Sequence, residues 1–339
     1  MAFFYIGILS GCAESGVLDR DLVIERDGRY QQTETQENRE TEAAKSESGV
    51  MEAEAAESES GVMETEAVES KAGVQEPFSA EITSQKQPLT ELAEESWSSY
   101  FHGLNGAAVV YDPAGGQYRI YNRELAMTRR SPCSTFKIIS SLIALEHGII
   151  DPEDSTRLWS GEVFWNEAWN QDMDFPGAFR ESCVWYFRDI IDEIGQDLMK
   201  EELERLSYGN QDSSDWDGSQ KSNNSNRALT GFWIESSLAI SPREQTEVME
   251  RIFGTGSVYS EDTRNQLKQV MAVTGQSAPA IYGKTGMGKA HGVTVDAWFA
   301  GMAETEDRTL YFCVYLGETQ GQQVSSAIAR EIAVKILTE

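Results

Sequence analysis

Histidine is scarce in this sequence of 339 residues, which has only three. His102, His147 and His291 lie far apart, without the Cys-x-x-Cys or His-x-x-x-His spacing of a zinc site. The same scarcity argues against a Ser-His-Asp triad, in which a histidine activates the nucleophile. The sequence therefore predicts chemistry that uses neither histidine nor a bound metal.

Positive charge is also in short supply, with 28 Lys and Arg residues against 56 Asp and Glu, a net charge of −28. Proteins that bind nucleic acid neutralise phosphates with clustered basic side chains, so no nucleic-acid partner is expected. After the N-terminus, no stretch approaches the roughly 20 apolar residues of a membrane-spanning helix. The length itself allows one large domain or two small ones.

Aromatic residues are nearly absent from residues 13–95, where only Tyr30 and Phe78 occur and every tryptophan comes later. The same segment has 22 acidic and 7 basic residues. Low hydrophobicity with high net charge leaves too little apolar surface to offset the entropy of ordering. Residues 13–95 are therefore predicted to be a disordered acidic tether.

The tether contains a repeat of twelve residues. Residues 46–57 read Ser-Glu-Ser-Gly-Val-Met-Glu-Ala-Glu-Ala-Ala-Glu, residues 58–69 repeat this with small changes, and a decayed third copy starts at Ser70. So few copies with so few large apolar residues indicate a duplicated linker rather than a solenoid.

The first twelve residues form a short apolar run that ends in Leu9-Ser-Gly-Cys12. This ending resembles the lipobox of bacterial lipoproteins, in which the cysteine is lipidated. The resemblance implies that residues 1–12 are the remnant of a lipoprotein-type signal, with a lipid anchor at Cys12 and an extracytoplasmic location. The alternative is an apolar N-terminus without a signal function.

Residues 96–339 have the pattern of one globular domain with strands at both ends. Residues 106–111 and 118–121, separated by a Pro-Ala-Gly-Gly turn, predict a β-hairpin. A second hairpin is predicted from residues 296–302 and 309–316, which flank a polar turn.

The chain between the hairpins is predicted to be largely helical, beginning with a helix over residues 134–147 that Gly148 ends. Apolar residues from Ile328 to Ile336 suggest a closing helix. Strands at both ends with helices between them predict an α+β domain. In it, an antiparallel sheet of N- and C-terminal strands is flanked by helices.

The chemistry is expected at the start of the first helix, where Ser134 precedes Lys137 by three residues. At this spacing both side chains emerge on one helix face. A serine hydroxyl needs a base to become a nucleophile, and without a suitable histidine the lysine is the nearest candidate. A Ser-x-x-Lys arises by chance about once in a chain of this length, so alone it means little.

Other short motifs follow Ser134-x-x-Lys137 in a fixed order. They are Ser182-Cys-Val184, Tyr208-Gly-Asn210, Phe232-Trp-Ile234 and Lys284-Thr-Gly286. This ordered set resembles the class D β-lactamases, serine enzymes of the penicillin-binding, transpeptidase-like superfamily whose active site uses a modified lysine. The resemblance spans about residues 97–337. It implies β-lactam antibiotics as partners and hydrolysis of their amide bond as the activity.

The resemblance also implies roles for the site residues. Ser134 would form the acyl-enzyme, and its backbone N–H would make the oxyanion hole together with that of Met287. Lys137 would be the general base, carboxylated by CO₂ to N6-carboxylysine, and burial would favour the neutral amine that this requires. Trp233 would hold the carbamate through its indole N–H. No cofactor is expected other than the CO₂ or bicarbonate.

The remaining motif residues are assigned by the same resemblance. Ser182 would relay a proton towards the leaving lactam nitrogen. The strand Lys284-Thr285-Gly286 would lie at the sheet edge and meet the substrate carboxylate. Val184 and Ile234 would form an apolar lid over the carbamate, although ordinary core packing explains such residues equally well.

Three features depart from the family pattern. The segment 211–229 is longer than usual and is expected to be a mobile loop near the site. Where many relatives place a carboxylate-binding arginine, this chain has Ser325 or Ser326, with Arg330 about a turn later. Two cysteines adjoin the motif serines: Cys133 precedes Ser134, and Cys183 follows Ser182. They could be buried packing residues, a disulfide or oxidisable thiols.

Two other classes of protein carry some of these motifs. Sensor domains of membrane β-lactam receptors resemble class D enzymes but stay acylated, so such a protein would be acylated at Ser134 without turnover. Such receptors have spanning helices and a zinc protease, and this sequence shows neither. Penicillin-binding transpeptidases typically carry Ser-x-Asn in the middle motif, which Ser182-Cys-Val184 does not match.

Overall fold

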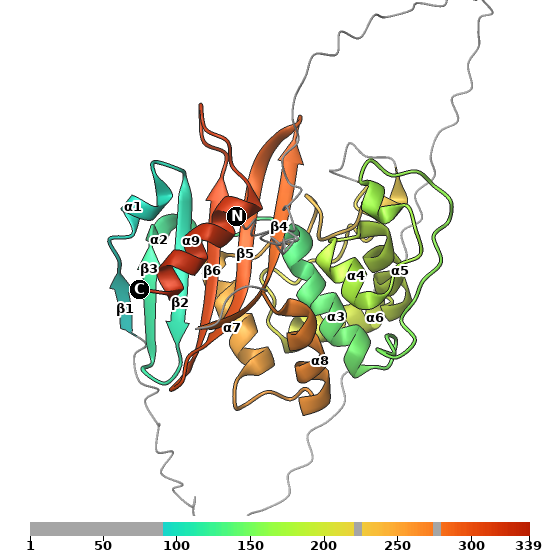
Figure 1. The fold of residues 1–339 in the computed structure, drawn as a ribbon, viewed down its shortest axis with the longest axis horizontal. Coiled ribbons are helices and arrows are strands. Elements are labelled where there is room, and N and C mark those ends of the chain that lie inside the picture. Colours follow the sequence, from blue (N-terminus) through green and yellow to red (C-terminus); the bar gives the residue numbers. More distant parts are fainter. Residues whose placement is uncertain (1–90, 220–225, 274–278) are drawn as a thin grey trace, which may run out of the picture. The chain divides into compact units, whose positions relative to one another are not determined.

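A six-stranded β-sheet organises the part of the chain that the computed structural model describes, residues 91–339 without 220–225 and 274–278 (Figure 1). Its strand order is β1-β3-β2-β6-β5-β4. The strands are β1 (Glu91–Glu94), β2 (Gly106–Asp112), β3 (Gln117–Tyr121), β4 (Ala280–Ala290), β5 (Val293–Glu304) and β6 (Thr309–Gly317).

Helices connect and cover the strands. They are α1 (Ser98–Phe101), α2 (Arg123–Ala126), α3 (Lys137–Glu146), α4 (Phe175–Arg180), α5 (Val184–Ile194), α6 (Gln196–Arg205), α7 (Pro242–Phe253), α8 (Glu261–Met271) and α9 (Ser326–Leu337). Short 3₁₀ turns span Cys133–Phe136, Glu167–Trp169 and Arg227–Leu229. Both predicted hairpins, the helical middle region and the closing helix are present, so the predicted α+β class is confirmed.

The sheet differs from the prediction at one edge. All pairings from β3 to β4 are antiparallel, but β1 runs parallel to β3, which makes the sheet mixed. β1 lies within residues predicted to be tether, and it gains an ordered partner because β3 offers an unpaired edge. The domain therefore begins at least five residues earlier than predicted. Cys12, the repeats and the rest of the predicted tether lie outside the described residues.

The two faces of the sheet bury different helices because side chains alternate along a strand. On β6, Phe312 and Val314 pack in one apolar cluster with Ile332 of α9. Tyr311 points the other way and belongs to the cluster that contains Val248 of α7. The sheet is thus covered on both faces, with α9 on one and α7 on the other (Figure 1).

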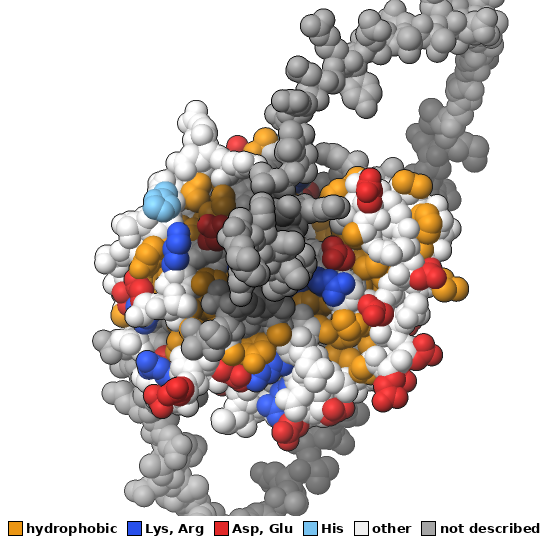
Figure 2. All heavy atoms as spheres, viewed as in Figure 1, with side chains coloured by type: hydrophobic (Ala, Val, Ile, Leu, Met, Phe, Trp, Pro, Cys, Tyr) orange, Lys and Arg blue, Asp and Glu red, His pale blue; other side chains and the backbone are white. Residues whose placement is uncertain are grey.

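A helical region lies beside the edge strand β4, with α3 as its central helix (Figure 1). Every residue from Lys137 to Leu145 of α3 is buried, and the helix packs against α5 and α8. Acidic side chains are spread over the face of this region that Figure 2 shows. Among the helices in the described ranges, none is both long and apolar enough to cross a bilayer.

A substitution at Gly209 can test how closely this region is packed. Gly209 has φ +52°, and a Cβ there would lie 2.1 Å from the carbonyl oxygen of Ala239. Gly209→Ala is expected to lower the free energy of unfolding by about 2 kcal/mol or more, from left-handed strain and this clash. Calorimetry should show a fall in Tm of about 4 °C or more.

The matched control for this turn is Gly116→Ala. Gly116 has a similar φ of +62°, but a Cβ there meets nothing within 4 Å. Only the left-handed strain should then be felt, about 1 kcal/mol. Equal losses of Tm in the two variants would contradict the close packing of the Gly209 turn.

Candidate active site

Ser134 lies on the 3₁₀ turn Cys133–Phe136, directly before α3. The predicted helix over 134–147 is therefore a 3₁₀ turn followed by α3, which begins at Lys137. Cys133 adopts a left-handed φ of +49°, an unfavourable conformation for a residue with a side chain. Its N–H donates to the carbonyl oxygen of Trp233 at 3.0 Å, which fixes the backbone before the nucleophile.

The side chain of Lys137 is almost completely buried, with 1% exposed. Its Nζ donates a hydrogen bond to Ser134 Oγ at 2.9 Å and faces the Phe187 ring, 5.3 Å from the centroid. Burial lowers the pKa of the Lys137 amine to about 8 because a charged ammonium loses its hydration there. At neutral pH about one amine in ten is then neutral and able to accept a proton or CO₂.

Trp233 supplies a hydrogen-bond donor that has no acceptor. The indole is completely buried and stacks on Phe136, with ring centroids 6.1 Å apart. Among the described residues, none accepts a hydrogen bond from the Trp233 Nε1–H. A buried N–H without a partner is costly, and a carboxylated Lys137 would provide an anionic acceptor. The residues present thus fit the carbamate that the resemblance to class D β-lactamases implies.

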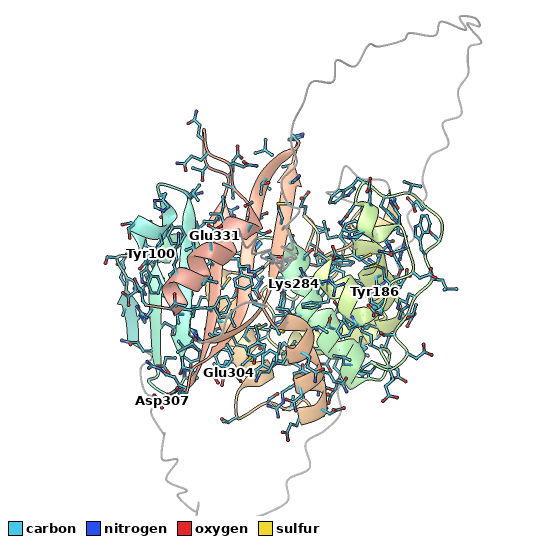
Figure 3. The ribbon with its side chains drawn as sticks, in the orientation of Figure 1. Tyr100, Tyr186, Lys284, Glu304, Asp307 and Glu331 are labelled. Atoms are coloured by element: carbon cyan, nitrogen blue, oxygen red, sulfur yellow. The ribbon has the colours of Figure 1, made fainter. Side chains whose placement is uncertain are left out.

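Ser182 and Lys284 form a second hydrogen-bonded pair. Ser182 lies between α4 and α5 with φ +56°, and Lys284 Nζ donates to its Oγ at 3.1 Å. Lys284 also donates to the carbonyl oxygen of Thr285 at 3.1 Å. Burial, together with the charge of Lys137, lowers the pKa of Lys284 to about 7. Figure 3 labels Lys284 where β4 borders the helical region.

The predicted edge position of residues 284–286 is observed, because β4 is the last strand of the sheet. Gly286 lets β4 run close to the nucleophile turn, since a Cβ there would lie 3.0 Å from the oxygen of Pro132 and 3.1 Å from the nitrogen of Thr135. Met287 follows, with its side chain 42% exposed. The strand that carries the proposed oxyanion N–H of Met287 therefore packs directly on the turn that carries Ser134.

A carboxylate that the sequence analysis missed ties β4 to the Trp233 segment. Glu235 accepts a hydrogen bond from the Lys289 N–H, at the bulge where the β4–β5 register shifts. The Glu235 N–H donates to Ser131 Oγ at 2.8 Å, and Ser131 Oγ donates to the Trp233 carbonyl at 3.1 Å. Burial and the nearby Asp296 raise the pKa of Glu235.

The two cysteines near the site are free, buried thiols. Burial raises the pKa of both, that of Cys183 to about 11, so neither thiol ionises readily. Of the three states considered from the sequence, the structure shows the packing residue and not the disulfide. Val184 and Ile234, the predicted lid, are half-buried and pack against the main core.

The other departures are partly explained. Ser325 is the N-cap of α9, accepting from the Ile328 N–H at 3.3 Å, and Arg330 is exposed. In the segment 211–229, which is described except for 220–225, Trp216 stacks on Phe232 with centroids 5.2 Å apart. The predicted mobility of this segment stays a prediction.

Comparison with known proteins decides the family. The protein-family model of the penicillin binding protein transpeptidase domain matches residues 106–338 of this sequence. The chain belongs to this family. The predicted resemblance to class D β-lactamases within it is also confirmed, with 31% identity to the probable β-lactamase YbxI of Bacillus subtilis. That match covers 70% of this chain and 81% of the relative.

Other members of the family are receptors. The chain is 31% identical to the regulatory protein BlaR1 of Bacillus licheniformis over 74% of this chain, but spans only 39% of that relative. The C-terminal domain of the BlaR penicillin-receptor superimposes with a TM-score of 0.64, covering 74% of this chain and 97% of the domain. The class D β-lactamase of Bacillus subtilis superimposes with a TM-score of 0.61, 29% identity, and coverage of 72% and 94%. The chain thus has the fold of both groups.

The lowered pKa of Lys137 predicts how carboxylation of this amine would depend on pH. CO₂ in equilibrium with bicarbonate adds to the neutral amine and a proton is released, so at constant bicarbonate the ratio of carboxylated to free Lys137 should rise about tenfold per pH unit below pH 8 and level off above it. The carbamate signal from ¹³C-bicarbonate, measured by NMR between pH 6.5 and 9.5, checks this. A rise that continues towards pH 10 would indicate an ordinary, solvated lysine.

Proposed function

We propose that this protein hydrolyses the amide bond of β-lactam antibiotics through an acyl-enzyme on Ser134. The observation that carries the proposal is the contact of 2.9 Å between Nζ of the buried Lys137 and Ser134 Oγ. A lysine whose pKa is lowered by burial can act as a base at neutral pH, which an exposed lysine cannot.

Acylation follows from the positions of these groups. Ser134 Oγ attacks the lactam carbonyl carbon while the base at Lys137 accepts the hydroxyl proton. The backbone N–H groups of Ser134 and Met287 stabilise the negative oxygen, with each donor worth about 3 kcal/mol in such a site. The C–N bond then breaks, and Ser182 passes a proton from Lys284 to the leaving nitrogen, along the observed contact of 3.1 Å.

Deacylation requires a water molecule to attack the ester carbon of acylated Ser134. A carboxylated Lys137 would supply an anionic base for this water, in place of an amine that is mostly protonated at neutral pH. Trp233 is suited to hold such a carboxylated side chain, because its N–H is buried and without an acceptor. Val184 and Ile234 offer only apolar atoms, so they exclude competing donors and keep the base poorly hydrated.

A β-lactam receptor that is acylated at Ser134 and does not turn over is the second candidate. The similarity to the penicillin-receptor domain of BlaR favours it. The two functions differ only in deacylation, since both form the same acyl-enzyme.

The fate of the acyl-enzyme separates these candidates. The full-length protein is mixed with benzylpenicillin, freed of excess drug and followed by intact mass spectrometry in bicarbonate buffer. Hydrolysis predicts an adduct on Ser134 that disappears within minutes as unmodified protein returns. A one-to-one adduct that persists for hours would instead establish a receptor.

We further propose that the protein is extracytoplasmic and anchored to the membrane through lipid on Cys12, followed by the acidic tether. The lipobox-like sequence supports this, and its residues lie outside the described structure. Cells fed radiolabelled palmitate are expected to label the protein, and Cys12→Ala is expected to lose the label. Equal labelling of both proteins would contradict the anchor.

A further inference from the structure

Arg188 is a charged side chain that the mechanism above does not use, although it is 1% exposed. It lies on α5, four residues after Val184 and next to Phe187, the ring that Lys137 faces. Burying a charge is unfavourable unless it is paired and hydrogen-bonded. A buried charge next to the residue whose ring Lys137 faces therefore needs a physical explanation.

Hydrogen bonds fix the plane of the Arg188 guanidinium. Asp192, one turn later on α5, accepts from its Nε at 3.2 Å and from its Nη2. The carbonyl oxygen of Trp216 accepts from Nη1 at 2.9 Å. Asp192 is itself held by Arg227, which donates to both carboxylate oxygens at 2.6 and 3.0 Å.

Two tryptophan rings lie against this fixed guanidinium. Arg188 Cζ is 5.2 Å from the centroid of Trp216 and 5.1 Å from that of Trp233. A cation on an aromatic face is attracted by the π electrons, most strongly for tryptophan and in desolvated sites. The indole of Trp233 is therefore held by Phe136 and by Arg188.

We propose that Arg188 is a positioning residue for Trp233: its guanidinium orients the indole and strengthens the Nε1–H as a donor to a carboxylated Lys137. The inference rests on the proposed function, since it assigns a cause to the carbamate that this function uses. The cation draws π density from the indole, which makes its N–H a better donor to an anion.

The test measures bicarbonate affinity rather than activity alone. The carbamate signal of the full-length protein is titrated with ¹³C-bicarbonate at pH 7.5. Arg188→Gln is expected to raise the half-saturating bicarbonate concentration about tenfold, which is part of what one desolvated cation–π contact contributes. Arg188→Lys keeps the charge without the planar stack and should raise it about threefold, so it keeps the test valid if the glutamine variant does not fold.

Arg157→Gln is the matched control. Arg157 also stacks on an aromatic ring, with Cζ 5.5 Å from the centroid of Tyr186, and pairs with Glu193 of α5 at 2.8 Å. Tyr186 is labelled on the helical side in Figure 3. This variant should bind bicarbonate as the unaltered protein does. In a Trp233→Phe background, Arg188→Gln should add little further loss, because it acts through the indole.

The outcomes distinguish the inference from the proposed function. A carbamate in the unaltered protein that Arg188→Gln and Arg188→Lys both leave unchanged overturns the inference and leaves the function intact. An equal loss in Arg157→Gln also overturns it, since any arginine–carboxylate pair beside an aromatic ring would then do the same. No carbamate in the unaltered protein at saturating bicarbonate overturns the inference and the carboxylated-lysine step of the proposed function, whereas hydrolysis itself is tested by the fate of the Ser134 adduct.

Discussion

Replacing Lys137 with methionine is expected to lower kcat/KM for nitrocefin by about 10⁴-fold, the upper end of what one positioned general base contributes. Lys137 is the group hydrogen-bonded to Ser134 Oγ, so its loss leaves the hydroxyl without a base. Both acylation and deacylation should fail, because the same side chain acts in each step. Stopped-flow acylation and steady-state hydrolysis measure the two effects.

The Tm of Lys137→Met shows whether the loss of activity is caused by unfolding. Methionine fills most of the volume of the lysine stem and removes a buried amine that is penalised by desolvation. The Tm should therefore be unchanged or raised, which is the usual trade between stability and activity. Lys268→Met is the control, since Lys268 pairs with Glu304 away from Ser134. Retention of a tenth or more of the activity in Lys137→Met would contradict its role as the base.

Trp233→Phe is expected to cause a large loss in the rate of deacylation. It keeps an aromatic ring against Phe136 but removes the N–H that has no acceptor among the described residues. Losing one donor to a buried anion is expected to slow deacylation by about 10²-fold or more, the cost of removing a charge-stabilising hydrogen bond. Acylation should slow less, so acylated Ser134 accumulates. High bicarbonate should restore part of the turnover by mass action.

Trp97→Phe is the control for this variant. Trp97 is also a buried tryptophan, but its Nε1–H donates to Glu339 at 3.2 Å, and it packs in the cluster that contains α9. Its replacement should leave the ratio of acylation to deacylation unchanged. If Trp233→Phe behaves in the same way, the indole N–H does not hold a carbamate.

The sequence predicted the parts of the site that local motifs carry. Ser134 and Lys137 are close because a single turn joins them, and such spacing can be read directly from the chain. The two hairpins were predicted because alternating apolar runs and polar turns are local signals. The β1 strand was missed because its partner, β3, lies more than twenty residues away and its own composition is acidic.

The supports of the site could not be predicted in the same way. Phe187 and Arg188 follow Val184 on one helix, but nothing in their spacing shows that one faces Lys137 and the other Trp233. Glu235 reaches the β4 bulge across more than fifty residues of sequence. These contacts depend on tertiary packing, which hydrophobic periodicity does not encode.

β-Lactam hydrolysis by this protein is tested most simply with nitrocefin and the full-length protein, with and without bicarbonate, alongside the fraction of Ser134 that is acylated. A hydrolase with a carboxylated Lys137 should show many turnovers per molecule, a rate that rises with bicarbonate, and a small acylated fraction. One turnover followed by complete, lasting acylation at every bicarbonate concentration would contradict hydrolysis and establish a penicillin-binding receptor.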